Sequence, residues 1–143
     1  MLEIKNLDFS YKTQVVFKNI NLTFEKGSIY GLLGENGVGK TTLLKLISGL
    51  QGPSAGTCTV DGVASFSRLP ETLQKIFFIS EDFAVPEGTP VNYVHDLCRF
   101  YPNYDEKLFF ELCGEMEVAP ERKYGEMSFG QQKKCLIATA LSL

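Results

Sequence analysis

The residues whose types and spacing carry the clearest chemistry form the run GENGVGKTT. This run matches the phosphate-loop pattern G-x-x-x-x-G-K-[ST] at every fixed position. Its members are Gly34, Glu35, Asn36, Gly37, Val38, Gly39, Lys40, Thr41 and Thr42. Glycines let the backbone curl so that N–H groups point at an anion, and Lys40 supplies a full charge for β- and γ-phosphates during catalysis. Because the Thr41 hydroxyl can ligate Mg²⁺, the run predicts a site for nucleotide phosphates and their metal ion.

Two elements are needed to hold such a loop, a strand before it and a helix after it. The apolar segment Ser28–Leu33 predicts a buried strand that runs into the loop, and Thr42–Ile47 predicts an amphipathic helix that leaves it. Further upstream, apolar and polar residues alternate in Leu2–Leu7 and Ile20–Glu25, which indicates two half-buried strands.

Downstream of the loop, Thr57–Val60 predicts a strand that ends at the turn Asp61–Gly62. The continuous apolar run Lys75–Ile79 predicts a strand buried on both faces. Apolar residues are spaced as on a helix over 91–112, and a break at Pro102–Asp105 divides this stretch into two helices. A final helix is expected over Gly130–Leu143. The inward side chains of that final helix are expected to be Leu136, Ile137, Ala140 and Leu141.

The order of these elements predicts an α/β fold in three parts. Residues 1–85 form an N-terminal antiparallel β part and the core that carries the phosphate loop, and residues 86–125 form a helical insertion. Glu121–Met127 is a polar connection, and residues 126–143 return to the core as the segment Met127–Lys134 and the final helix.

Composition narrows the class of protein. A net charge of −3 and a pI near 5.2 argue against a nucleic-acid partner. No apolar run approaches the ~20 residues that cross a bilayer, and the N-terminus does not read as a signal peptide. A soluble cytoplasmic chain is expected, with four reduced cysteines and a structural rather than catalytic His95.

The segment Met127–Lys134 resembles the LSGGQ signature of ATP-binding cassette (ABC) ATPases. Tyr11, Ile47–Leu50 and Pro53–Thr57 are similar to further features of that family and occur in the family's order. The resemblance covers essentially the whole chain. It implies ATP and Mg²⁺ as cofactors and a P-loop NTPase fold of the ABC type.

The resemblance also implies roles for individual residues. Tyr11 would stack on adenine, and Ser128, Gly130 and Gln131 would face the γ-phosphate of a nucleotide bound by a second copy in a head-to-tail dimer. Ser128 can cap the helix that follows it while the helix N–H groups point at the anion, so it is expected to take part in catalysis.

Two positions depart from the family's pattern. Phe129 replaces a signature glycine, which is expected to weaken contacts with the phosphate. Glu81 stands where the family has a metal-binding glutamine, and as a carboxylate it can ligate Mg²⁺ and act at the γ-phosphate. An alignment shifted by one residue would give that role to Asp82, and both alternatives stay open.

A third departure is that the family's later features, a strand ending in Asp-Glu and a strand followed by histidine, are not found in the chain. We expect the core strands that carry them to be missing, and the chain to be the N-terminal part of a longer ATPase. The 143-residue chain is then expected to bind ATP without hydrolysing it.

The longer protein is expected to power an ABC transporter. It would lie against the inner face of the cell membrane and work with a membrane-spanning subunit on a separate chain. The alternative is a non-transport ABC ATPase that acts on ribosomes or DNA, which the short insertion and acidic balance do not favour.

Overall fold

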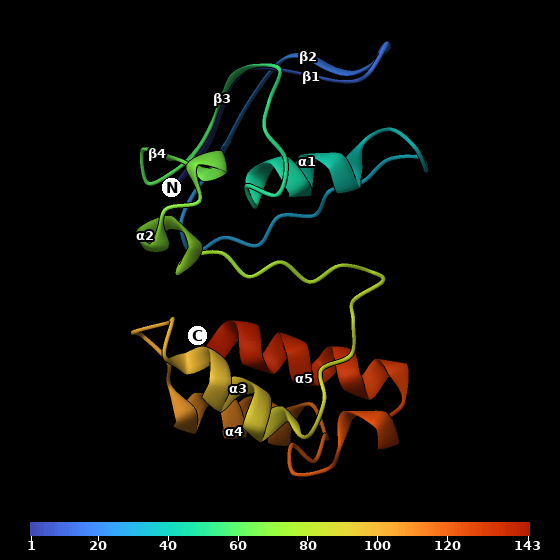
Figure 1. Ribbon diagram of the computed structural model, residues 1–143, viewed down its shortest axis with the longest axis vertical. Coiled ribbons are helices and arrows are strands. Elements are labelled where there is room, and N and C mark those ends of the chain that lie inside the picture. Colours follow the sequence, from blue (N-terminus) through green and yellow to red (C-terminus); the bar gives the residue numbers. More distant parts are fainter. The chain divides into compact units, whose positions relative to one another are not determined.

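A long β-hairpin opens the structure (Figure 1). Strand β1, Leu2–Tyr11, pairs antiparallel with β2, Gln14–Phe24. On its other edge β1 pairs antiparallel with β3, Ala55–Val60, and β3 pairs with the short β4, Val63–Ala64. The sheet order is therefore β2-β1-β3-β4, and the two half-buried strands expected at the N-terminus are confirmed, each longer than its sequence pattern.

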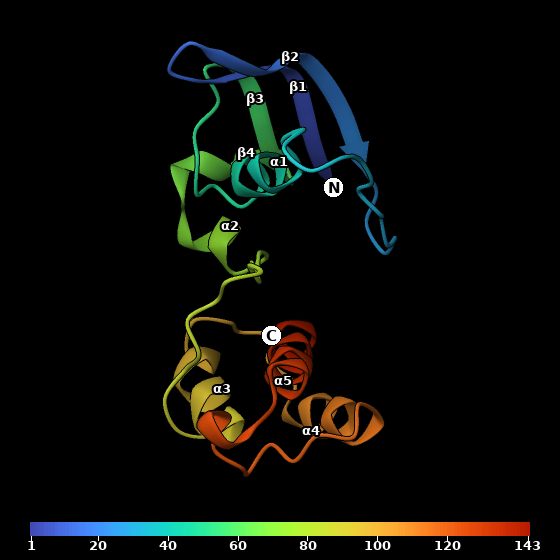
Figure 2. The same ribbon diagram turned by 90° about the vertical axis from the view of Figure 1, so that its right-hand side faces the viewer.

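The computed structural model describes all of residues 1–143, which divide into two compact units, Met1–Ile76 and Phe77–Leu143. In unit 1 the helix α1, Lys40–Ile47, lies across one face of the sheet (Figure 2). The sheet turns alternate apolar residues toward α1, and α1 turns apolar residues one helical turn apart toward the sheet. The buried core of this unit consists of Ile4, Leu7, Phe9, Leu43, Leu46 and Cys58.

The turn expected at Asp61–Gly62 joins β3 to β4, as predicted. Both residues have positive φ, 50° at Asp61 and 82° at Gly62, as in the two-residue turns that match the twist of a hairpin. The 3-10 helix η1, Ser65–Ser67, and the short helix α2, Pro70–Leu73, follow. Ser65 is fully buried and its hydroxyl donates to the carbonyl of Leu46 at 3.0 Å, which fixes this connection against α1.

The strand predicted over Ser28–Leu33 is wrong. No strand forms there, and the side chains of Ile29 and Leu33 are exposed. The strand predicted over Lys75–Ile79 is also wrong. A strand exists only through hydrogen bonds to a neighbouring strand, and neither segment pairs with the four-stranded sheet.

Unit 2 consists of helices that bury one face each. Helix α3 is Pro90–Cys98, α4 is Glu106–Glu115, the 3-10 helix η2 is Tyr124–Glu126, and α5 is Phe129–Ser142. The core of this unit contains Val94 of α3, Phe109 and Cys113 of α4, Tyr124 of η2, and Cys135, Leu136 and Ala138 of α5. The helices expected from the sequence are confirmed.

Local signals set where these helices begin. Thr89 caps α3 by accepting a hydrogen bond from the N–H of Asn92 at 3.2 Å, with Pro90 in the first turn. Asp105 caps α4 by accepting from the N–H of Leu108 at 3.0 Å. The prediction that Ile137 and Leu141 of α5 point inward is wrong. These side chains face outward and are 40% and 60% exposed. Leu136, which we expected inside, is buried.

Candidate nucleotide site

The phosphate loop of unit 1 ends at an open helix start. Gly39 is the N-cap residue of α1, and no side chain caps the first turn. The first hydrogen bond inside the helix runs from the N–H of Leu43 to the carbonyl of Gly39 at 2.8 Å. The N–H groups of residues 40–42 are those that a helix leaves without an internal partner, so they are suited to bind an anion.

The side chain of Lys40 binds back to the backbone of the loop. Its Nζ donates to the carbonyl oxygens of Gly34 and Glu35, each at 2.7 Å. The ammonium group is thereby held at the backbone of the loop, and Lys40 is itself the first residue of the uncapped helix α1. Positive charge and backbone donors therefore converge on one place, which is what phosphate groups require.

Gly39 is required at the end of the loop for two reasons. Its φ is 102°, a conformation that side-chain-bearing residues rarely adopt, and a Cβ there would lie 2.7 Å from a methyl carbon of Val16 and 2.9 Å from the ring of Phe17. The hairpin β1–β2 thus packs directly against the loop. No pattern within the loop predicts this contact, because Val16 and Phe17 lie far from it in the sequence.

Tyr11 lies at the same end of the hairpin. Its hydroxyl group is 3.4 Å from Oγ1 of Thr42, and it donates a hydrogen bond to Oε1 of Gln51 at 3.0 Å. The ring packs edge-on against Phe9, with centroids 4.8 Å apart and planes at 87°. The structure therefore brings Tyr11 beside the phosphate helix while 43% of the residue remains exposed.

The candidate metal ligands lie in both units. In unit 1 Thr41 is exposed at the helix start, next to Lys40 and among uncapped N–H donors, so its hydroxyl fits a role at a phosphate-bound Mg²⁺. In unit 2 Glu81 and Asp82 are both exposed in the segment between Phe77 and α3. Because both carboxylates are exposed, exposure does not favour either as the metal ligand, and both alternatives stay open.

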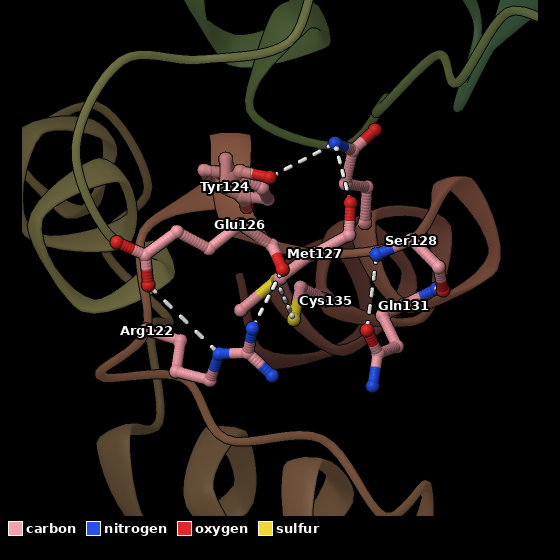
Figure 3. Close-up of polar contacts among 8 residues, drawn as sticks. Arg122, Tyr124, Glu126, Met127, Ser128, Gln131 and Cys135 are labelled. Atoms are coloured by element: carbon pink, nitrogen blue, oxygen red, sulfur yellow. Dashed lines mark hydrogen bonds and ion pairs between the residues drawn. The ribbon is translucent and has the colours of Figure 1, made fainter.

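The signature residues of unit 2 form a capping box at the start of α5. Oγ of Ser128 accepts from the N–H of Gln131 at 3.3 Å, and Oε1 of Gln131 accepts from the N–H of Ser128 at 3.0 Å (Figure 3). The Ser128 oxygen acts as an acceptor, so its hydroxyl hydrogen can be donated outward. Ser128 and Gly130 are both exposed. The helix start can therefore present the hydroxyl and the first backbone N–H groups to an anion.

The connection before Ser128 is held by side chains of two neighbours. Nε2 of Gln132 donates to the carbonyls of Tyr124 at 2.9 Å and Met127 at 3.2 Å, and the guanidinium of Arg122 donates to the carbonyl of Glu126 at 2.6 Å (Figure 3). These bonds satisfy backbone carbonyls where no regular element does so. They fix the direction in which the chain enters α5.

Three sulfur-containing side chains, those of Met127, Cys113 and Cys135, pack together in the core of unit 2. Sγ of Cys135 lies 3.8 Å from Sδ of Met127, and Cys113 of α4 is hydrogen-bonded to Cys135. That hydrogen bond and burial raise the pKa of the Cys113 thiol. Both thiols are buried, so they serve as packing groups of the core.

Phe129, at the glycine position of the signature, is the first residue of α5 and is 57% exposed. Its ring stacks on Phe83, and Nζ of Lys133 lies 4.7 Å from the ring centroid. Sequence reasoning assigned no role to Phe83, Gln51 or Gln132. The contacts of Phe83 and Gln51 join residues far apart in the chain, and no spacing rule signals them.

The chain resembles proteins of one family. The family model described as ABC transporter matches residues 17–143. The ABC transporter ATP-binding protein YtrB of Bacillus subtilis is 36% identical over 135 residues, which cover 94% of this chain and 46% of YtrB. The chain thus spans about half the length of this curated relative. No helix of the structure combines the length and apolar character that a membrane span needs.

Solved structures show the same fold. A protein of Pyrococcus furiosus named as an ABC transporter ATP-binding protein superposes with a TM-score of 0.83 at 31% identity, over 99% of this chain and 70% of its own. The ATP-binding cassette MJ0796, in a dimeric post-hydrolysis state bound to ADP and Pi, superposes with a TM-score of 0.76 at 25% identity, over 99% of this chain and 69% of its own. The predicted fold class, a partial α/β fold of the ABC type, is confirmed.

Proposed function

The chain belongs to the ABC transporter family of ATP-binding proteins, and we propose that it binds MgATP as the nucleotide-binding part of a transporter driven by ATP-dependent dimerisation. One observation carries the proposal. Lys40, held over the phosphate loop by Gly34 and Glu35, adjoins the uncapped start of α1. This arrangement concentrates positive charge and N–H donors where a nucleoside triphosphate carries most of its negative charge.

Each end of the nucleotide has its own residues in this proposal. Lys40 and the loop N–H groups bind the β- and γ-phosphates, and Tyr11 offers its exposed ring to adenine. Bound Mg²⁺ would neutralise charge on the phosphate oxygens, with Thr41 as a protein ligand. Glu81 and Asp82 remain the alternative carboxylate candidates for a metal ligand.

A second copy of the chain completes the proposed site. Ser128, Gly130 and Gln131 of one copy face the γ-phosphate held by the other, so that two nucleotides join two copies head to tail. The capping box supports this role because it leaves the Ser128 hydroxyl hydrogen free to be donated. MJ0796, to which the chain is similar, was solved as a dimer with ADP and Pi.

The remaining partner is a membrane-spanning subunit on a separate chain, against which the protein would lie at the inner face of the membrane. The helical part, expected over 86–125, is the proposed contact surface. The name of YtrB supports a transport role. An acidic net charge of −3 supports a protein partner over a nucleic acid.

Hydrolysis is proposed for the whole protein rather than for these 143 residues. Lys40 and Ser128 can stabilise charge on the phosphates, but neither can take a proton from an attacking water at neutral pH. The strand ending in Asp-Glu that the family uses for this purpose is not among the residues of this chain.

Two measurements on the 143-residue chain test the proposal. Calorimetric titration with MgATP should show saturable binding, and absence of heat at millimolar nucleotide would overturn the nucleotide site itself. Sedimentation with a non-hydrolysable ATP analogue should show a dimer that Ser128→Arg abolishes, while the matched control Ser54→Arg, at an exposed serine of unit 1, retains it. If the chain binds nucleotide but forms no dimer, the nucleotide site stands and the proposed ATP-dependent dimerisation is overturned.

A further inference from the structure

Gln51 accepts a hydrogen bond from the hydroxyl group of Tyr11. It lies in the loop after α1, half-buried, and its own backbone is fixed because its N–H donates to the carbonyl of Lys45 at 3.2 Å. Its Oε1 accepts the Tyr11 hydroxyl at 3.0 Å across 40 residues of sequence. The acceptor therefore lies in a loop that is tied by a backbone hydrogen bond to the helix that carries the phosphate-binding residues.

The Tyr11 ring is restrained at both of its ends. Its ring makes a T-shaped contact with Phe9, with the ring centroids 4.8 Å apart. At the far end its hydroxyl reaches both Gln51 and, at 3.4 Å, the buried Thr42 of the first turn of α1. A tyrosine that is 43% exposed at a strand end otherwise has more than one staggered rotamer open to it. The contacts with Phe9, Gln51 and Thr42 favour the rotamer in which they form, while 43% of the residue stays exposed.

We propose that Gln51 is a positioning residue that orients Tyr11 for stacking on the base of the nucleotide, and so sets affinity for the base but not for the phosphates. The inference rests on the proposed function, in which Tyr11 stacks on adenine. A ring already held in its binding orientation loses less rotational freedom when the base arrives, which strengthens binding without any contact between Gln51 and the nucleotide. Removing the acceptor should release the ring.

The test compares a ligand that has a base with one that lacks it. Affinities for MgATP and for magnesium tripolyphosphate are measured by calorimetry on the parent chain and on Gln51→Leu, Tyr11→Phe and the double variant. Gln51→Leu removes the acceptor, and Tyr11→Phe removes the donor but keeps the ring. Gln74→Leu makes the same chemical change at an exposed position of unit 1 and is the matched control.

Each single variant should weaken ATP binding by about three- to tenfold, the effect of losing one neutral hydrogen bond, with tripolyphosphate binding unchanged. The double variant should bind ATP no more weakly than either single variant, because both remove the same bond. Gln51→Glu, which retains an acceptor oxygen, should bind ATP within about twofold of the parent.

The outcomes separate this inference from the function on which it rests. Gln51→Leu that binds ATP as the parent does, or that weakens ATP and tripolyphosphate equally, overturns the positioning role. Tyr11→Ala is the reference, since it removes the ring. If Tyr11→Ala weakens ATP binding and Gln51→Leu does not, only the role of Gln51 is lost. If Tyr11→Ala leaves ATP affinity unchanged, both the stacking of Tyr11 on adenine and the positioning role of Gln51 are overturned.

Discussion

Phe129 stacks on Phe83, with ring centroids 5.7 Å apart and planes at 21°. This contact joins the first residue of α5 to the segment that carries Glu81 and Asp82, two and one residues before Phe83. A glycine at position 129 could not make it. The aromatic residue in the signature thus connects the start of α5 with the segment that carries the candidate metal ligands Glu81 and Asp82.

We expect this stack to stabilise unit 2. Phe129→Ala and Phe83→Ala should each lower the free energy of unfolding, and a double-mutant cycle should give a coupling of about 0.5–1.5 kcal/mol. Chemical denaturation followed by circular dichroism measures it. Lys133→Ala should cost less than Phe83→Ala, because a cation near an exposed ring contributes about 0.5–1 kcal/mol. Strictly additive losses would show that the two rings do not interact in solution.

Lys40→Ala should remove most of the affinity for ATP. The ammonium group contributes a charge-assisted contact to the phosphates, so the loss should be about 2–3 kcal/mol. Calorimetric titration measures it. Lys45→Ala, one helical turn and more beyond the loop in α1, is the control and should bind ATP as the parent does. Equal affinities of the parent and Lys40→Ala would contradict the assignment of the phosphate site.

Gly39→Ala should damage the loop without changing any charge. The substitution forces a side chain onto a φ of 102° and places its Cβ 2.7 Å from Val16, so ATP affinity should fall about 5- to 150-fold, from strain of roughly 1–3 kcal/mol. Gly31→Ala is the matched control, because nothing lies within 4 Å of a Cβ there and its φ is not positive. The same titration applies. A Gly39→Ala chain that binds ATP normally would mean that the loop has another conformation in solution.

Stability in acid should depend on Asp61. Its carboxylate accepts a hydrogen bond from Lys75 at 2.7 Å and pairs with the amino group of Met1, which lowers its pKa from 3.8 to about 2. Because the folded-state pKa lies below the unfolded one, the stabilisation is fully present above pH 3.8 and is lost as pH falls toward 2. Asp61→Asn should flatten the pH dependence of unfolding in that window.

The matched control for Asp61 is Glu25→Gln, at an exposed carboxylate that forms no ion pair in the structure. Urea midpoints measured between pH 2 and pH 5 supply the comparison. If Asp61→Asn and the parent lose stability in parallel over this range, the ion pairs of Asp61 are absent in solution.

The 143-residue chain should bind ATP and release no phosphate above background. Its phosphate-binding groups, Lys40 and the start of α1, stabilise charge but do not activate the attacking water. Phosphate release from purified chain measures this, with Lys40→Ala as the control for contaminating ATPases. Turnover that disappears in the Lys40 variant would show that these residues suffice for catalysis.

Features that depend on a few neighbouring residues were determined by the sequence alone. The phosphate loop, the Asp61–Gly62 turn and the capped start of α5 at Ser128 all appear where their residue types predict them. Each depends on local backbone conformation and on hydrogen bonds that span only a few residues. The family could also be inferred from the two motifs and their order.

Only the tertiary structure decided features that need a distant partner. Ser28–Leu33 has the composition of a buried strand, but a strand forms only when another strand pairs with it, and none in this sheet does. In the same way, the hydrogen bond from Tyr11 to Gln51 and the stack of Phe129 on Phe83 arise because folding brings remote segments together. Composition and spacing describe what a segment can do next to a partner, and the fold determines which partner it has.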